Sequence, residues 1–376
     1  MRPNVLEVGL DAIAYNVRSL RQRIGGDVQL FAALKANAYG FGIERVADTV
    51  VQAGADGLAM VEVDHAVALR QRRINVPILL YGGTPASAAL VAAAEEHDLM
   101  PTLLDLEDAQ TYECHATHRL KAFLKFDVGL ERLGAAPEDA PSLGVALRAL
   151  HHLELRGVYT HLHVPPHAPA EEMYPYLQWQ FARFKSALEA LREAGIEPSI
   201  RMAASSGVLM QTDEMHLNAV DPGHLLFGMY PSGPRRPPLD LRPALRSLKS
   251  RLVQVKAVNR TAFVEQAPFA IQPEMAIGVF PFGISDGMPL VNCGHVLVNG
   301  RRVPVLSVSL EHTRVDLTGV EARRGDEVVI VGRQGAGEIS SAEVLERLGQ
   351  HIPSALPLAV QSSVPRSYVA GVVAGD

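Results

Sequence analysis

The fold class follows from residues 30–61, which read LFAALKANAYGFGIERVADTVVQAGADGLAMV. The stretch starts with a short apolar run, FAALK, and ends with another, GLAMV, and both have the length of a strand. Between them, IERVADTVVQAG places apolar residues three and four positions apart, as an amphipathic surface helix does. A strand, a helix and a second strand in this order predict that the two strands pair in parallel.

The same alternation continues through about the first 225 residues. It gives eight strand-like runs: FAALK, GLAMV, ILLYG, MPTLLD, KAFLKFD, ELRGVYTHL, SIRMAA and HLNAVD. Eight such units match a (β/α)8 barrel in number and size. A doubly wound open sheet has the same pattern and is the alternative. We predict the α/β barrel.

The pattern changes at residue 231. Residues 231–243, PSGPRRPPLDLRP, are rich in proline, which disfavours a regular helix and indicates a linker. Beyond it, RLVQVKAVNRTAFVE, HVLVNGRRVPVLSVSL and DEVVIVG alternate apolar and polar residues, and Asn299-Gly300 is typical of a hairpin turn. We expect a barrel over residues 9–232 and a mostly β domain over residues 240–376, which residues 1–8 join.

Composition excludes several classes of protein. The 35 basic and 41 acidic residues are mixed along the chain, without the basic stripe that nucleic acid requires. Cys114 and Cys293 are too few for a disulfide framework and lack the spacing of a zinc site. We found no signal-peptide core and no apolar segment of about 18 residues. We therefore expect a soluble, cytoplasmic protein without a metal, nucleic acid or membrane partner.

Several motifs together indicate a family. Residues 35–42 read KANAYGFG, directly after the first predicted strand. Further blocks are LKFDVGLERLG, GVYTH, VDPGHLLFGMYPS, PFGISDGMP and VDLTG, and they span nearly the whole chain. The chain resembles the alanine racemase family. The resemblance implies a barrel that binds pyridoxal 5'-phosphate (PLP), a β domain, and a homodimer in which each subunit completes the other's active site.

Lys35 is the first candidate catalytic residue. It ends a barrel strand on the face where barrel active sites assemble, and its amine can form a Schiff base. A solvated surface lysine is the alternative reading. The resemblance implies that Lys35 holds PLP.

The resemblance also implies a set of phosphate contacts. Tyr39 and Ser205 are similar to the tyrosine and serine that bind the PLP phosphate, although each can be an ordinary loop hydroxyl. Gly223 and His224 add backbone N–H groups at the start of a helix, where partial positive charge favours an anion.

Three further residues correspond to groups around the PLP ring. Arg132 resembles the arginine that contacts the phenolic oxygen and the substrate carboxylate, and Lys125 the often carbamylated lysine that braces it. A solvated salt bridge is the alternative reading for both. His161 resembles the histidine beneath the pyridine ring.

The chain departs from the family at the pyridine nitrogen. Asp221 stands where the family has an arginine opposite that nitrogen. An arginine can only donate and keeps the nitrogen unprotonated, whereas a carboxylate favours the pyridinium. We expect Asp221 to make the ring a stronger electron sink.

It also departs at the second catalytic base. The family's tyrosine is Ile284 here, in GISDGMP, and isoleucine cannot transfer a proton. Losing a positioned base costs about 10²- to 10⁴-fold in rate. The candidate replacements are Ser285, Asp286, Glu311 and His312. Leu310 and Glu311 replace a substrate-contacting methionine and aspartate, and Ser362 a phosphate-contacting tyrosine, so the substrate pocket has been rebuilt.

Three functions follow. The first is a PLP enzyme acting at the α-carbon of an amino acid or amine, diverged to decarboxylation, aldol-type or other lyase chemistry, or transamination, with Lys35 and an Asp221-supported pyridinium. The second is an amino-acid racemase with a substitute second base, for which alanine is the family default. The third is a PLP-binding protein without turnover.

Overall fold

The chain folds into two compact units in a computed structural model that describes residues 2–165, 169–231, 239–288 and 294–369. One unit comprises Ala12–Ala38 and Gly42–Arg242, and we call it the barrel unit. The other comprises Met1–Asp11, Tyr39–Phe41 and Pro243–Asp376, and we call it the β unit. Among the described residues, no helix combines the length and apolarity needed to cross a membrane.

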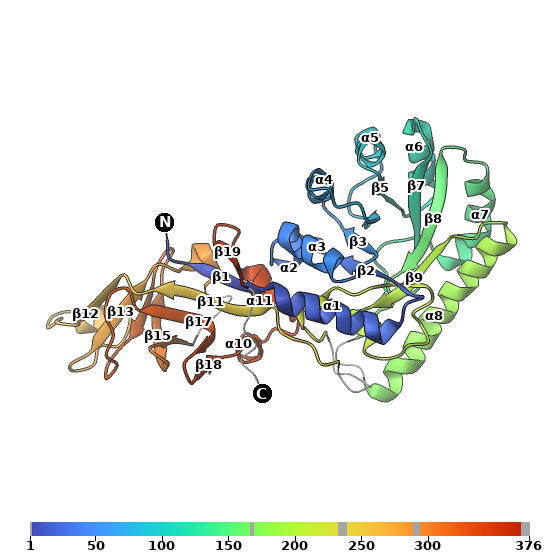
Figure 1. Cartoon of the computed structure of the whole chain (residues 1–376). Coiled ribbons are helices and arrows are strands. Elements are labelled where there is room, and N and C mark those ends of the chain that lie inside the picture. The colour runs from blue at the N-terminus through green and yellow to red at the C-terminus, as the bar shows by residue number, and fades with distance from the viewer. Residues whose placement is uncertain (1, 166–168, 232–238, 289–293, 370–376) are drawn as a thin grey trace. The chain divides into compact units, whose positions relative to one another are not determined.

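The barrel unit is built on one parallel sheet, whose strands run β5-β4-β3-β2-β10-β9-β8-β7-β6 in space (Figure 1). Their bounds are β2 Gln29–Ala33, β3 Gly57–Met60, β4 Ile78–Leu80, β5 Leu99–Met100, β6 Thr102–Leu103, β7 Leu120–Phe126, β8 Leu153–Thr160, β9 Ile200–Ser205 and β10 Ala219–Asp221. The two ends of this order, β5 and β6, are separated in the chain by Pro101 alone. Proline has no N–H for a sheet, so one bent segment counts as two strands and nearly closes the sheet. The predicted barrel is confirmed, and the open sheet is wrong.

Side chains fill the inside of the barrel. One buried cluster takes a member from each strand position: Phe31, Ala59, Leu79, Met100, Phe123, Tyr159, Ile200, Met202 and Ala219. Glycine makes room for the largest rings, since a Cβ at Gly57 would lie 2.5 Å from Phe31 and one at Gly157 2.1 Å from Phe123. The interior is therefore a packed core, and chemistry is confined to the strand ends.

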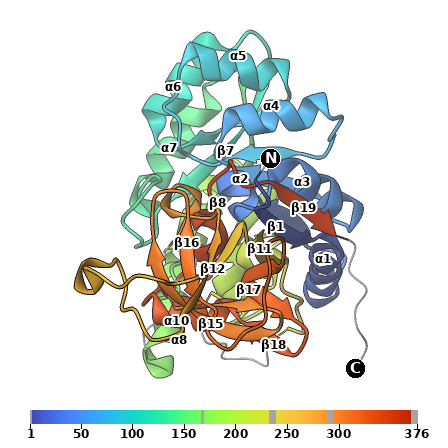
Figure 2. The same cartoon turned by 90° about the vertical axis from the view of Figure 1, so that its left-hand side faces the viewer.

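Helices lie around the outside of the sheet (Figures 1 and 2). They are α1 Leu10–Ile24, α3 Ile43–Gln52, α4 Val63–Gln71, α5 Ala88–Glu96, α6 Leu106–His115, α7 Ala140–Arg148, α8 Ala170–Glu193 and the short α9 Ser206–Leu209. Helix α3 buries Ile43, Val46, Ala47 and Val50, the apolar stripe expected from the sequence.

The β unit holds a mostly antiparallel sheet in the order β12-β13-β16-β15-β14-β17-β11-β1-β19, with β18 paired to β17. Its elements are β1 Val5–Gly9, β11 Leu245–Arg251, β12 Gln254–Ala257, β13 Ala276–Phe280, β14 His295–Val298, β15 Arg301–Val308, β16 Thr313–Asp316, β17 Glu327–Gln334, β18 Gly337–Ile339, β19 Arg366–Val369, α10 Ser341–Arg347 and α11 Ala355–Ala359. The N-terminal β1 lies between β11 and β19. Asn299 and Gly300 both have positive φ and form the hairpin turn between β14 and β15, as their sequence predicts.

Candidate active site

Lys35 follows strand β2 by two residues and begins α2 (Lys35–Tyr39), a turn with left-handed backbone. Ala36, Asn37 and Ala38 each have a φ of 54°, a conformation that costs about 1–2 kcal/mol for a residue with a side chain. The turn is held because the Ala38 N–H donates to the Leu34 carbonyl at 2.9 Å and the Ile43 N–H donates to Asn37 Oδ1 at 2.7 Å. Such stored strain is typical of functional sites.

The surroundings of Lys35 favour a reactive amine. Burial lowers the pKa of its ammonium most, Asp221 raises it and Arg132 lowers it. Because a neutral amine is the nucleophile in Schiff-base formation, this environment suits the predicted role.

Asp221 ends strand β10 and is buried, with 7% of its surface exposed. Tyr81, the residue after β4, donates a hydrogen bond from its hydroxyl to Asp221 Oδ2 at 2.7 Å. Asp221 Oδ1 is buried and has no hydrogen-bond partner among the described residues. Burial raises the pKa of the Asp221 carboxyl to about 6, against the lowering effects of the Tyr81 hydrogen bond, Lys35 and Lys125. A buried acceptor without a donor is costly, and a protonated ring nitrogen is a group that fits it.

Lys125 lies on β7 and is also buried, with 6% of its surface exposed. Its Nζ donates to the Leu133 carbonyl at 2.7 Å and lies 5.6 Å from the centroid of the Tyr159 ring. Burial, and then the charge of Arg132, lowers the pKa of Lys125 to about 8. The amine is therefore partly neutral near pH 8, although it is shielded from solvent.

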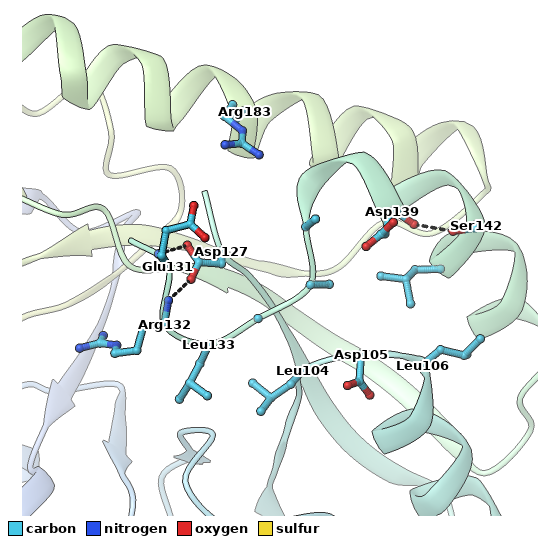
Figure 3. A pocket seen from close by; sticks show the side chains of 14 residues that line it. Leu104, Asp105, Leu106, Asp127, Glu131, Arg132, Leu133, Asp139, Ser142 and Arg183 are labelled. Carbon is cyan, nitrogen blue, oxygen red and sulfur yellow. Dashed lines mark hydrogen bonds between the residues drawn. The ribbon is translucent and has the colours of Figure 1, made fainter. Parts of the chain in front are cut away.

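Arg132 sits on a loop that the Asp127 carboxylate shapes by accepting backbone N–H groups from Gly129, Leu130, Glu131 and Arg132. The loop lines a cavity of about 800 Å³ together with Arg183 of α8 (Figure 3). Neither Lys35 nor Asp221 lines this cavity, so it does not mark the centre of the site.

The two histidines are neutral at physiological pH. Burial, followed by the charges of Lys35 and Arg132, lowers the pKa of His161 to about 3. Burial, followed by Lys35, lowers the pKa of His224 to about 4. His161 follows β8 directly, and His224 begins the 3-10 turn His224–Phe227 after β10. A neutral imidazole suits the place beneath a ring but adds no charge to a phosphate contact.

Ser206 is a residue that sequence reasoning missed. Its hydroxyl oxygen accepts the Gly223 N–H at 2.9 Å and the Leu225 N–H at 3.3 Å. The neighbouring Ser205, predicted as the phosphate contact, ends β9 and is half-buried. The pair of serines in MAASSG was the available signal, but sequence does not say which one faces the turn after β10. Tyr39 groups with the β unit, and its phosphate contact stays a prediction.

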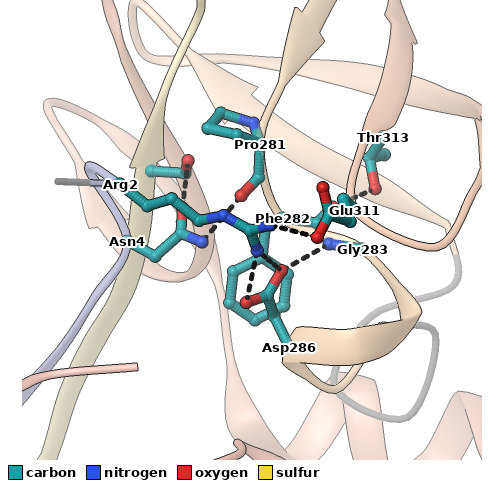
Figure 4. A network of polar contacts seen from close by, with 9 residues as sticks. Arg2, Asn4, Pro281, Phe282, Gly283, Asp286, Glu311 and Thr313 are labelled. Atoms are coloured by element: carbon teal, nitrogen blue, oxygen red, sulfur yellow. Dashed lines mark hydrogen bonds and ion pairs between the residues drawn. The ribbon is translucent and has the colours of Figure 1, made fainter. Parts of the chain in front are cut away.

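The departures Ile284 and Leu310 belong to the β unit and are the sequence neighbours of Gly283 and Glu311, which Figure 4 labels. The Ile284 N–H donates to the Ser309 carbonyl at 3.0 Å, and the Ser285 N–H to the Leu310 carbonyl at 2.9 Å. Both apolar side chains are exposed, by 54% for Ile284 and 65% for Leu310. Neither can move a proton.

An ion-pair network occupies two of the four candidate bases. Arg2 contacts Asp286 at 3.2 Å and Glu311 at 2.6 Å. Asp286 is buried and also accepts the Gly283 N–H at 2.9 Å. Ser285 and His312 are exposed. Asp286 is therefore committed to holding the loop, which makes it a poor choice for a base.

Comparison with known proteins covers almost the entire chain. The family models "Alanine racemase, N-terminal domain" and "Alanine racemase, C-terminal domain" match residues 8–231 and 245–368. Alanine racemase of Symbiobacterium thermophilum is 36% identical, with 98% of this chain and 97% of that protein covered. Alanine racemase 2 of Caldanaerobacter subterraneus subsp. tengcongensis is 33% identical over 98% and 95%. The crystal structure of alanine racemase from Bacillus anthracis with bound L-Ala-P is 31% identical, covers 99% and 97%, and superposes with a TM-score of 0.88.

A barrel with a lysine at the end of its first strand, followed by a β domain, defines a fold type III PLP-dependent enzyme. The chain belongs to the alanine racemase family. The predictions of family, enzyme class and PLP are confirmed. The relatives support a racemase better than the diverged reaction that the sequence departures suggested.

Proposed function

We propose that the protein is a PLP-dependent amino-acid racemase in which Lys35 moves the α-proton. The proposal rests on two residues at the ends of the barrel strands. Burial lowers the pKa of Lys35, and the buried Asp221 Oδ1 has no hydrogen-bond donor among the described residues. Alanine, the substrate in the relatives' names, is the first substrate to test.

The residues present fit PLP. Lys35 would bind its aldehyde carbon, Asp221 its ring nitrogen and Arg132 its phenolic oxygen. Tyr39, Ser205, Gly223 and His224 are the proposed phosphate contacts, and Ser206 holds the Gly223 turn among them. When bound, PLP supplies an electron sink that makes the α-hydrogen of an amino acid acidic.

Each of the surrounding residues has a separate role in the proposed reaction. The amine of Lys35, whose pKa burial lowers, exchanges the α-proton on one face of the substrate. Arg132 orients the substrate carboxylate, and Lys125 supports the Arg132 loop through the Leu133 carbonyl. His161 would contact the PLP ring as a neutral imidazole.

The second face needs another proton carrier. Ile284 cannot serve, Asp286 is committed to Arg2 and Gly283, and Glu311 is paired with Arg2. Water, Ser285 or His312 remain, the two side chains being exposed. We propose that the protein is a homodimer in which Ser285 or His312 of one subunit acts on the active site of the other. We also propose that the enzyme works in the cytoplasm with its two cysteines reduced.

A one-sided reaction is the second candidate. Ile284 removes the family's second base, and Asp221 strengthens the electron sink, and both changes suit decarboxylation, lyase chemistry or transamination more than racemisation. These reactions require a single proton transfer at the α-carbon.

Deuterium exchange separates the candidates. Holoenzyme is incubated with L-alanine or D-alanine, and then with other single enantiomers, in deuterated water, and followed by NMR and chiral chromatography. A racemase yields deuterated product of both hands from either starting enantiomer. Exchange of one hand alone, or release of carbon dioxide, aldehyde or keto acid, would establish the second candidate. No exchange with any amino acid would leave PLP binding without turnover.

A further inference from the structure

Tyr81 has no role in the reaction described so far, yet its hydroxyl reaches the most buried acid of the site. It directly follows β4, and its ring lies 5.8 Å from the ring of Tyr159 and packs against the buried barrel cluster. The 2.7 Å hydrogen bond to Asp221 Oδ2 joins residues that are 140 positions apart in the chain. It therefore joins the ends of β4 and β10, which β3 and β2 separate in the sheet, and the packing of the tyrosine ring holds the hydroxyl in place.

The hydrogen bond makes the two oxygens of Asp221 different. Oδ2 accepts from Tyr81, and Oδ1 is buried without a donor. The Tyr81 hydroxyl donates this hydrogen bond to Asp221. A donated hydrogen bond stabilises the ionised form of the Asp221 carboxylate. The charged groups that act on Asp221 are Lys35, after β2, and Lys125, on β7, and both favour the same form. Burial alone opposes them.

We propose that Tyr81 is a positioning residue that keeps Asp221 ionised and turned so that Oδ1 accepts the N–H of the PLP ring. The inference rests on the proposed binding of PLP at Lys35. Without the hydroxyl, both oxygens of Asp221 compete for one ring proton. The proton then moves from the ring nitrogen toward the carboxylate, because the ionised carboxylate has lost its stabilising donor.

Tyr159 provides a matched control. It is a buried tyrosine of the barrel cluster against which the half-buried Tyr81 packs, and its hydroxyl lies 3.1 Å from Thr102 Oγ1. Tyr159→Phe and Tyr81→Phe each remove one hydroxyl and keep the ring. Only Tyr81→Phe removes the hydrogen bond to Asp221.

The test is ¹⁵N NMR of holoenzyme loaded with PLP labelled at the ring nitrogen, near neutral pH. In the unaltered protein and in Tyr159→Phe we expect the resonance of a protonated ring. In Tyr81→Phe the ratio of protonated to neutral ring should fall by about tenfold or more, the size expected when a hydrogen bond to a charged group is lost. Asp221→Asn supplies the neutral reference. A resonance in Tyr81→Phe that matches the unaltered protein would overturn the proposal.

A second arm covers failure of Tyr81→Phe to fold, which circular dichroism would reveal. Replacing Tyr81 with 3-fluorotyrosine makes the hydroxyl a stronger donor and should shift the ring further toward the protonated form. A shift toward the neutral form would contradict the inference. Neither arm needs turnover. An inactive enzyme with the expected resonances would therefore sink the racemase proposal alone, and an active racemase with an unchanged Tyr81→Phe resonance would sink this inference alone.

Discussion

The ends of the barrel strands and the exposed segments of the β unit around Ile284 and Leu310 both depart from the pattern that the resemblance implies, but they differ in what surrounds the departure. At the strand ends, Asp221 stands where the resemblance implies an arginine, and the Tyr81 hydroxyl and the charges of Lys35 and Lys125 act on its carboxylate. In the β unit, Ile284 stands where the resemblance implies a tyrosine. Its side chain is exposed, and the nearby Asp286 is paired with Arg2. In the proposed site, polar and charged groups therefore surround the departure at the strand ends, whereas the departure at Ile284 leaves an exposed apolar side chain.

The largest effect should come from removing the amine of Lys35. Lys35→Ala should abolish the visible absorbance of lysine-bound PLP and reduce activity by about 10²- to 10⁴-fold or more, because the base and the attachment point are the same group. Absorbance spectra and the exchange assay measure the two losses. Lys121→Ala is the control, since Lys121 is exposed and pairs with Asp98 at 3.4 Å. Retention of the visible band in Lys35→Ala would contradict the assignment.

Asp221→Asn tests whether the carboxylate at the strand ends contributes to the reaction rate. An amide cannot hold a protonated ring nitrogen as a carboxylate does, so activity should fall by about 10- to 100-fold, the loss of one hydrogen bond to a charged group. The fall should appear in kcat, with PLP still bound. Asp48→Asn, which removes a surface pair with Arg72 at 2.7 Å, should leave the rate unchanged. An Asp221→Asn enzyme with full activity would remove the carboxylate from the mechanism.

Ile284→Tyr tests whether the exposed segment of the β unit lacks a second catalytic base. If the second face lacks an efficient base, restoring a phenol there should raise racemisation by about tenfold, a part of the 10² to 10⁴ that a positioned base contributes. The exposed position of Ile284 allows the larger side chain. Ile284→Phe separates proton transfer from shape, and an equal gain in both variants would show that shape alone is responsible.

The smallest effect is on stability. The pKa of Asp221 is raised to about 6 in the folded protein, so the folded state binds more protons than the unfolded state between about pH 4 and 6. Stability of the PLP-free protein should therefore fall as the pH rises through this window, by up to about 3 kcal/mol. Thermal unfolding of the unaltered protein and of Asp221→Asn should differ in this slope. Parallel curves would mean that the carboxyl is not strongly desolvated.

Local patterns predicted most of the fold. Strand and helix periodicity predicted the barrel, and Asn299-Gly300 the hairpin, because each depends on residues close together in the chain. The break at Pro101 and the place of β1 beside β19 depend on contacts between distant segments, which one sequence does not reveal. Motifs identified Lys35 and Asp221, but not the choice of Ser206 over Ser205 beside Gly223, since adjacent residues at a strand end point in different directions. Tyr81 was visible only as part of the strand ILLYG.

Chemical trapping of the cofactor tests the central claim most directly. Holoenzyme is reduced with borohydride, digested, and mapped by mass spectrometry to find the lysine that carries the phosphopyridoxyl group. Our account predicts the label on the peptide that contains Lys35 and on no other. A label on Lys125, whose pKa of about 8 makes it the competing amine, or the absence of any labelled peptide would contradict it.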